Sequence, residues 1–318
     1  MLTFLFILCL LAGLIAAVLA WGASKTRPFA AQSEALVPQA GQVMAVPGGA
    51  IHFLDLGPRD APVLVMIHGL GGYLQHFTYA MTSLLDQDYR IIVLDRPGCG
   101  YSDRDDEAQA ALTEQARMIW ALLDTLEIKR PVLVGHSLGG AVALAMALAR
   151  PKETAALALL APLTHPNEAG ASVFAGLNIP NPQIRKIWAR TWALPLARRH
   201  AVDTLHTIFA PESWPEDLMV RGGAALGLRP KSFLASVEDF LASHGIADLQ
   251  PRYGAELDMP GGVLCGAPDA ILDPELQGRP MQEYGFIFKL LPDRGHMLPI
   301  TAPRDCAAFV RQIAQTAD

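Results

Sequence analysis

The sequence LVGHSLGGAVALAMALARP, residues 133–151, sets a single serine between two glycines in an otherwise apolar run. The segment before Ser137, PVLVG at 131–135, is apolar throughout and predicts a buried strand. The segment after it, residues 138–149, is rich in Ala and Leu and predicts a helix that Pro151 ends. Ser137 is therefore expected at a sharp turn between a strand and a helix.

The spacing of Gly135, Ser137 and Gly139 fits the pattern G-x-S-x-G. At a strand-to-helix turn this pattern holds a serine hydroxyl clear of the sheet on a strained backbone. A Cβ at either glycine would crowd the neighbouring strand or helix, so both positions favour glycine. We interpret Ser137 as a nucleophile; the alternative is a serine that only caps the helix in a glycine-rich turn.

Apolar strands alternate with helical segments on both sides of this turn. Mostly parallel sheets covered by helices on both faces have this α/β pattern. The stretch from 165 to 255 is helix-like, proline-punctuated and rich in Trp, which predicts a helical lid inserted into one core at 43–164 and 256–318. Strands are expected within 48–57, 61–69, 89–100, 131–135, 156–162, 261–269 and 286–296, and helices within 76–88, 114–126, 138–149 and from 303 onward.

A serine hydroxyl needs a base within hydrogen-bond reach and a carboxylate that orients the base. His296 is the best placed of the nine histidines, because it follows the last expected strand and so falls at the same sheet edge as Ser137. His136 is set aside, since adjacent residues in a sharp turn point apart. Asp269 follows a strand end and is the favoured acid. Asp273 is the second candidate, although its place before a proline is more typical of a turn or helix cap.

Acyl chemistry also requires hydrogen-bond donors for the oxygen that becomes negative in the transition state. We expect these to be the backbone N–H groups of Leu138 and of Leu70, which lies in the loop HGLGG at 68–72. His68 and Gly69 are interpreted as residues that support this loop. The histidines have no ligand-like spacing and the four cysteines are scattered, so we expect no metal and no cofactor.

The motifs HGLGG, DRPGCGYS, GHSLGG, GAPDAILDP and GHMLP occur together in the order of the α/β-hydrolase superfamily. The chain resembles its serine-nucleophile branch, which includes monoacylglycerol lipases, carboxylesterases and carbon–carbon bond hydrolases, over about residues 43–163 and 256–315. The resemblance implies the α/β-hydrolase fold, an acyl-enzyme on Ser137, and a structural role for the loop at 95–102. Haloalkane dehalogenases and epoxide hydrolases of this fold carry Asp at the position of Ser137.

Residues 2–21 carry no charged side chain, and as a helix rising ~1.5 Å per residue they would span roughly 30 Å. This predicts a transmembrane anchor at 1–24, in preference to a cleaved signal peptide, which usually has a basic start and a shorter apolar core. Residues 25–42 are expected to form a linker. Lys25 and Arg27 favour a cytoplasmic catalytic domain.

The composition of the chain and the residues of the expected lid indicate which kinds of molecule the protein could bind. The chain is 51% hydrophobic and carries a net charge of −6 with scattered basic residues, which excludes a nucleic-acid partner. Residues 181–200 predict a basic amphipathic helix whose apolar face either packs on the core, the favoured interpretation, or touches lipid headgroups. That face carries Ile184, Ile187, Trp188 and Trp192. Phe209 and Trp214 are candidates to line an acyl pocket.

Together these features predict an esterase or lipase that acts on a small-molecule or lipid ester, with no obligate protein partner. Acyl transfer or carbon–carbon bond hydrolysis at the same site is one alternative. A non-catalytic membrane accessory protein on a hydrolase scaffold is the other.

Overall fold

The structure is a computed structural model that describes residues 1–167 and 172–317. Residues 168–171, which fall in the expected lid, and residue 318 lie outside this description. Strands of the described part form one sheet in the order β1-β2-β4-β3-β6-β7-β8-β9, with β5 paired to β2. The strands are β1 Gln42–Val46, β2 Gly49–Leu56, β3 Val63–Ile67, β4 Arg90–Leu94, β5 Asp103–Arg104, β6 Val132–His136, β7 Ala156–Leu160, β8 Gly261–Gly266 and β9 Ile287–Leu291.

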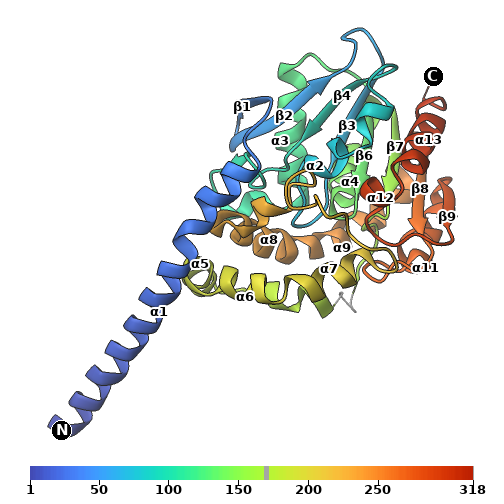
Figure 1. Cartoon of the computed structure of the whole chain (residues 1–318). Helices are drawn as coiled ribbons and strands as arrows, with labels where there is room; N and C mark the ends of the chain where they lie inside the picture. Colours follow the sequence, from blue (N-terminus) through green and yellow to red (C-terminus); the bar gives the residue numbers. More distant parts are fainter. Residues whose placement is uncertain (168–171, 318) are drawn as a thin grey trace.

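The sheet is antiparallel only where β2 meets its neighbours; from β4 through β9 every pairing is parallel. Side chains alternate between the two faces, so Leu133 of β6 packs in one apolar core while Val132 and Val134 pack in the other. Helices cover both cores (Figure 1), which confirms the expected α/β fold. One face carries α3 Leu112–Thr125 and α4 Leu138–Ala149, and the other α2 Gln75–Thr78, α12 Leu298–Thr301 and α13 Pro303–Ala314.

The segment 76–88 differs from its expected single helix. It forms only the short helix α2 and the 3₁₀ turn η1 Thr82–Leu84. Its large apolar side chains, Phe77, Met81 and Leu85, are nevertheless fully buried in the second core. Successive tight turns place these side chains inward at about the spacing of a helix. The apolar pattern therefore predicted correctly which side chains are buried, whereas the prediction of one continuous helix was wrong.

Helices are the only regular secondary structure in the described residues between β7 and β8, where turns and loops connect them. They form a layer at the carboxyl ends of the strands, on the side from which α1 projects (Figure 1). This layer consists of η4 Ser172–Leu177, α5 Pro182–Thr191, α6 Ala193–Arg199, α7 Ala201–Phe209, η5 Ala224–Leu228, α8 Pro230–Ala242, η6 Ser243–Gly245, α9 Ile246–Leu249, η7 Gln250–Arg252 and α10 Tyr253–Glu256. The remaining short helices are η2 Glu107–Ala110, η3 Pro151–Glu153, α11 Pro274–Gln277 and η8 Arg279–Tyr284.

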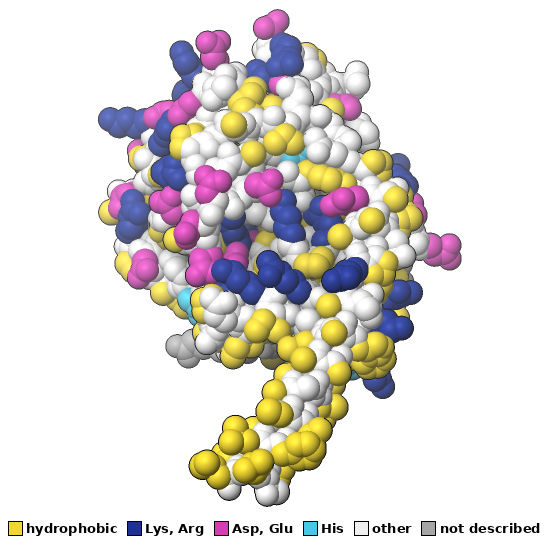
Figure 2. Space-filling view, turned by 90° about the vertical axis from the view of Figure 1, so that its left-hand side faces the viewer, with side chains coloured by type: hydrophobic (Ala, Val, Ile, Leu, Met, Phe, Trp, Pro, Cys, Tyr) yellow, Lys and Arg dark blue, Asp and Glu magenta, His cyan; other side chains and the backbone are white. Residues whose placement is uncertain are grey.

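Helix α1, Leu2–Leu36, continues through most of the expected linker. Its second half is helical because small side chains on one face let it pack against the lid: Gly22 lies against the Trp192 indole, and Thr26 Oγ1 donates to the carbonyl oxygen of Thr191 at 2.5 Å. Its first half projects from the domain with its apolar side chains exposed (Figure 2). By length and composition this half can cross a membrane.

Candidate active site

Ser137 occupies the turn between β6 and α4 with φ 54° and ψ −124°, a backbone region that side chains larger than glycine rarely adopt. The two flanking glycines make this turn possible. A Cβ on Gly135 would lie 2.5 Å from the Gly139 carbonyl oxygen, and one on Gly139 would lie 2.1 Å from that of Ile67. The strained serine is thereby held at the carboxyl edge of the sheet.

Three of the predicted side chains meet at this edge. His296 Nε2 lies 3.0 Å from Ser137 Oγ, and His296 Nδ1 lies 2.8 Å from Asp269 Oδ2. These residues follow the ends of β6, β8 and β9; β8 and β9 are adjacent in the sheet, and β7 lies between β6 and β8. Parallel strands end at the same edge, so residues far apart in sequence converge there.

The structure separates the two candidate acids. The side chain of Asp269 is fully buried, and its second oxygen accepts the backbone N–H groups of Ile271 and Leu272 at 2.8 and 3.0 Å. An ionised carboxylate can only accept, so His296 Nδ1 carries the proton and Nε2 is free to accept from Ser137. Asp273 instead caps α11, accepting the Glu275 N–H at 2.9 Å.

The two expected oxyanion donors border the serine. Leu70 and Leu138 line the same cavity as Ser137. Within residues 1–167 and 172–317, neither of their backbone N–H groups donates a hydrogen bond. Gly69 lets the loop approach closely, since a Cβ there would lie 2.8 Å from that of Ser137. Two unused donors beside a serine hydroxyl are the arrangement that an oxyanion requires.

His68 has both ring nitrogens engaged inside the loop. Its Nε2 accepts the backbone N–H of Arg96 at 2.9 Å, which leaves the proton on Nδ1 to donate to the Gly69 carbonyl oxygen at 2.8 Å. Burial, together with the nearby Arg96 charge, holds the pKa of His68 well below its usual value. The imidazole of His68 is thus neutral and hydrogen-bonded at both nitrogens within the loop.

His136, which was not expected to be the base, contacts the residue that was. Its Nε2–H donates to the backbone carbonyl oxygen of His296 at 3.0 Å, and the two rings pack with centroids 5.1 Å apart. Burial lowers the pKa of His136 well below its usual value, and the nearby His296 adds to the effect. Only the folded loop brings this contact about, so no local sequence signal reveals it.

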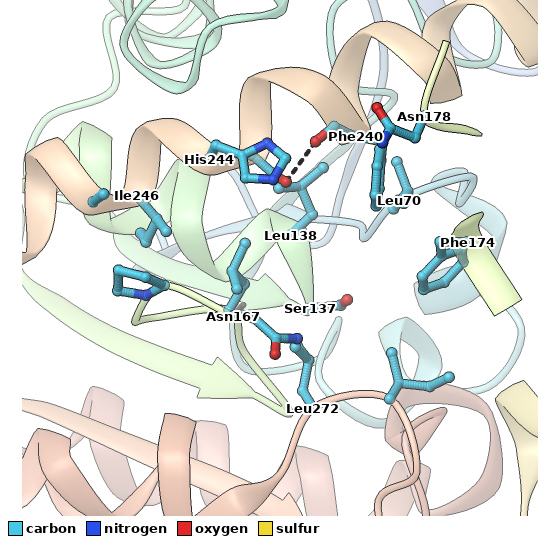
Figure 3. Close-up of a pocket in the computed structure, with 15 residues that line it drawn as sticks. Leu70, Ser137, Leu138, Asn167, Phe174, Asn178, Phe240, His244, Ile246 and Leu272 are labelled. Atoms are coloured by element: carbon cyan, nitrogen blue, oxygen red, sulfur yellow. Dashed lines mark hydrogen bonds between the residues drawn. The ribbon is translucent and has the colours of Figure 1, made fainter. Parts of the chain in front are cut away.

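A cavity of about 440 Å³ opens above the serine. Figure 3 shows the Ser137 hydroxyl directed into it, with Phe174 on the far side. Most of the lining is apolar and comes from Leu70, Leu138, Leu163, Phe174, Phe240, Ile246, Ile271 and Leu272. Neither Phe209 nor Trp214 is among the described residues that line it. Both pack in a separate cluster with Leu218, Met297 and Ile300, so the expectation for them was wrong.

Helix α5 differs from its favoured interpretation. Ile184 and Ile187 are 57% and 51% exposed, whereas Arg185 on the opposite side is buried. Arg185 turns inward because its guanidinium forms ion pairs with Glu107 and Glu238. The two isoleucines of the expected apolar face therefore point to solvent, on the side of the domain where α1 projects.

Among the described residues, no group of three or more His, Cys, Asp or Glu is arranged to hold a metal ion.

Comparison with known proteins agrees with the fold. The family described as "alpha/beta hydrolase fold" matches residues 62–210. The putative carbamate hydrolase RutD of Variovorax paradoxus is 34% identical over 124 residues, which are 39% of this chain and 47% of that protein. The chain thus spans less than half the length of the first curated relatives that it matches.

Solved structures resemble the whole domain. The crystal structure of a membrane phospholipase A superposes with a TM-score of 0.68 at 21% identity, covering 100% of this chain and 99% of that one. Haloalkane dehalogenase DbeA from Bradyrhizobium elkani gives a TM-score of 0.66 at 20% identity, covering 86% of this chain and 98% of that one. At these identities the likeness establishes the fold and leaves the reaction to be argued from the site.

Proposed function

We propose that the chain is a serine hydrolase of the α/β-hydrolase superfamily that cleaves carboxylic esters of lipophilic substrates; the family model that matches residues 62–210 supports this placement. The observation that carries the proposal is the continuous chain of hydrogen bonds from Ser137 through His296 to the buried Asp269, at the floor of an apolar cavity. The resemblance to the superfamily implies that its haloalkane dehalogenases carry Asp at the position of Ser137. A serine at this position favours a reaction that forms an acyl-enzyme.

The proposed reaction has two halves. As Ser137 Oγ attacks the ester carbonyl carbon, His296 Nε2 takes its proton and Asp269 stabilises the resulting imidazolium. The carbonyl oxygen becomes negative and accepts the Leu70 and Leu138 N–H groups. Collapse of this intermediate breaks the ester bond, His296 protonates the departing alkoxide, and an acyl-enzyme remains. Water then attacks with His296 again as base, which releases the acid and restores the serine.

The cavity supports a lipophilic substrate. Its volume of about 440 Å³ lies within the usual size of small-molecule sites, ~300–1,000 Å³. The apolar side chains around the hydroxyl favour an alkyl chain over a charged group. Asn167, Asn178, Ser243 and His244 add polar atoms to the lining, which suits an ester with a polar end.

We also propose that α1 anchors the enzyme in a membrane. Its first half is apolar and exposed, and its second half packs against the lid helices α5 and α6. A membrane crossed by residues 2–21 would lie beside the exposed Ile184 and Ile187 of α5. Lys25 and Arg27 favour a domain on the cytoplasmic side.

The test uses the full chain purified in detergent, with p-nitrophenyl esters of graded acyl length and a fluorophosphonate probe. Wild type is expected to turn over medium or long chains and to be labelled. Ser137→Ala is expected to lose both, with a fall in kcat of roughly 10⁴-fold or more. Ser83→Ala removes an exposed hydroxyl far from the cavity and is expected to behave as wild type.

The other outcomes identify the alternatives. Labelling of wild type without turnover of any ester would overturn ester hydrolysis in favour of acyl transfer or carbon–carbon bond hydrolysis. Absence of labelling in a folded wild type would favour the non-catalytic scaffold.

A further inference from the structure

A fully buried arginine lies directly behind the loop that carries Leu70. Arg96 follows β4, and its side chain is 0% exposed. Its Nε donates to the carbonyl oxygen of His68 at 2.9 Å and its Nη2 to that of Gly69 at 3.0 Å. Its backbone N–H donates to His68 Nε2. One residue thus binds the loop at three points.

The Gly69 carbonyl belongs to the same peptide group as the Leu70 N–H. That oxygen accepts from His68 Nδ1, Arg96 Nη2 and the Gly72 N–H at 2.8, 3.0 and 3.2 Å. This peptide is trans, and in a planar trans peptide the C=O and N–H point in opposite directions. Fixing the oxygen on the protein side therefore fixes the direction of the Leu70 N–H on the other side.

The arginine is held in turn by the lid. Arg96 Nη1 lies 2.8 Å from Asp239 Oδ2, and both side chains are 0% exposed. Burial raises the pKa of Asp239, but the charges of Arg96 and Arg104 outweigh it and the net pKa falls below the usual value. Asp239 belongs to α8, and the next residue, Phe240, lines the cavity. The helix that borders the substrate site thus also carries the counter-ion of Arg96.

We propose that Arg96, held by Asp239 of the lid, is the positioning residue that aims the Leu70 N–H at the developing oxyanion. This inference rests on the proposed ester hydrolysis and names a determinant of its rate. It makes the docked position of α8 a condition for full activity, since displacement of Asp239 removes the counter-ion of Arg96 and leaves its Nη1 held only by Gln115 of α3.

Arg104 provides a matched control. Its Nη1 lies 2.7 Å from the other Asp239 oxygen, and its side chain is 5% exposed. It shares the buried counter-ion and the lid contact of Arg96. Its other acceptors are the carbonyl oxygens of Pro97 and Ala235 and the Glu238 carboxylate, none of which belongs to the HGLGG loop. A general loss of lid packing affects both arginines, whereas loss of loop positioning is specific to Arg96.

The experiment compares Arg96→Lys with Arg104→Lys in the full chain. Lysine keeps the charge beside Asp239 but cannot span two carbonyl oxygens. For Arg96→Lys we expect kcat to fall by roughly 10- to 100-fold with KM within about twofold, part of the cost of losing one oxyanion donor. Affinity for an alkyl trifluoromethyl ketone, which forms an oxyanion on Ser137, should fall by the same factor as kcat/KM. For Arg104→Lys we expect both quantities to stay within about threefold.

A second variant, Asp239→Asn, removes the lid charge without changing side-chain size. We expect faster hydrogen–deuterium exchange of the backbone amides in 68–72 than in wild type, an effect that Arg104→Lys does not share. Equal losses of kcat in Arg96→Lys and Arg104→Lys, or an unchanged affinity of Arg96→Lys for the ketone, would overturn the inference. A wild type that neither turns over esters nor reacts with the fluorophosphonate would overturn the proposed function itself, and the positioning role with it.

Discussion

Ser137 illustrates how few side chains are needed to present a nucleophile. Its positive φ is tolerated because the turn is enforced on both sides by close backbone approach at Gly135 and Gly139. These contacts join β6 to α4 and α4 to the end of β3, so the strain is held by the sheet. The two glycines are therefore needed for the close backbone contacts of this turn, and their spacing around Ser137 can be recognised in the sequence.

The choice between Asp269 and Asp273 is open to a direct test. In Asp269→Asn we expect kcat to fall by roughly 10⁴-fold, because an amide no longer selects the imidazole tautomer with its proton on Nδ1. Asp273→Asn should keep activity and stability close to wild type, since Asn caps a helix as well as Asp. Steady-state ester kinetics and thermal unfolding of both variants provide the measurement. Comparable activity of the two variants would show that Asp269 is not the orienting acid.

Helix α5 shows why amphipathicity alone did not predict burial. The sequence places its isoleucines on an apolar face, and this face was expected to pack on the core. In the folded protein the buried pairing of Arg185 with Glu107 and Glu238 turns the helix, leaving Ile184 and Ile187 exposed. The partners of Arg185 come from η2 and α8, so only the tertiary arrangement fixes the rotation of α5.

This exposed face predicts a membrane contact. The double variant Ile184→Ser/Ile187→Ser should hydrolyse a long-chain ester in anionic vesicles roughly tenfold more slowly than wild type, for about 1.4 kcal/mol of lost apolar burial. Hydrolysis of a water-soluble short-chain ester should not change. Val43→Thr, an exposed position on β1 at the far edge of the sheet, is the control. Equal slowing on both substrates would contradict a contact with the bilayer.

Several buried histidines predict the pH dependence of stability for the whole domain. Burial lowers the pKa of His68 and His136 well below 6.5 and that of His76 to about 4, and it also lowers the pKa of the half-buried His165. The folded state keeps these groups neutral while the unfolded chain protonates them, so the unfolded state binds more protons below pH 6.5 and stability falls as the pH falls. We expect the free energy of unfolding to drop by about 3–4 kcal/mol between roughly pH 6 and pH 5 from the three strongly shifted groups.

Denaturant unfolding at pH 5, 6 and 7.5 checks this expectation. His136→Asn should reduce the slope by about a third, because one of the three strongly shifted groups is gone. Ser83→Ala, which removes no titrating group, is the control and should leave the slope unchanged. A wild-type stability that is flat from pH 5 to 7.5 would show that these histidines do not titrate on unfolding.

Much of this protein was predictable because its signals are local. Hydrophobic period and turn chemistry identified seven of the strands, α3, α4, α13 and the turn at Ser137, but not β1 or the two-residue β5. Because parallel strands end at the same edge of a sheet, and Asp269 and His296 each follow a strand, the sequence also indicated that the two residues lie at the same edge.

Other features depend on contacts between segments far apart in the chain. Packing on the lid made residues 25–36 helical, and a buried ion pair joined Arg96 to Asp239, 143 positions away in the sequence. The spacing of apolar residues shows which side of a segment is apolar, because that spacing is a local property of the sequence. Which other segment packs against that side is decided only by the tertiary structure.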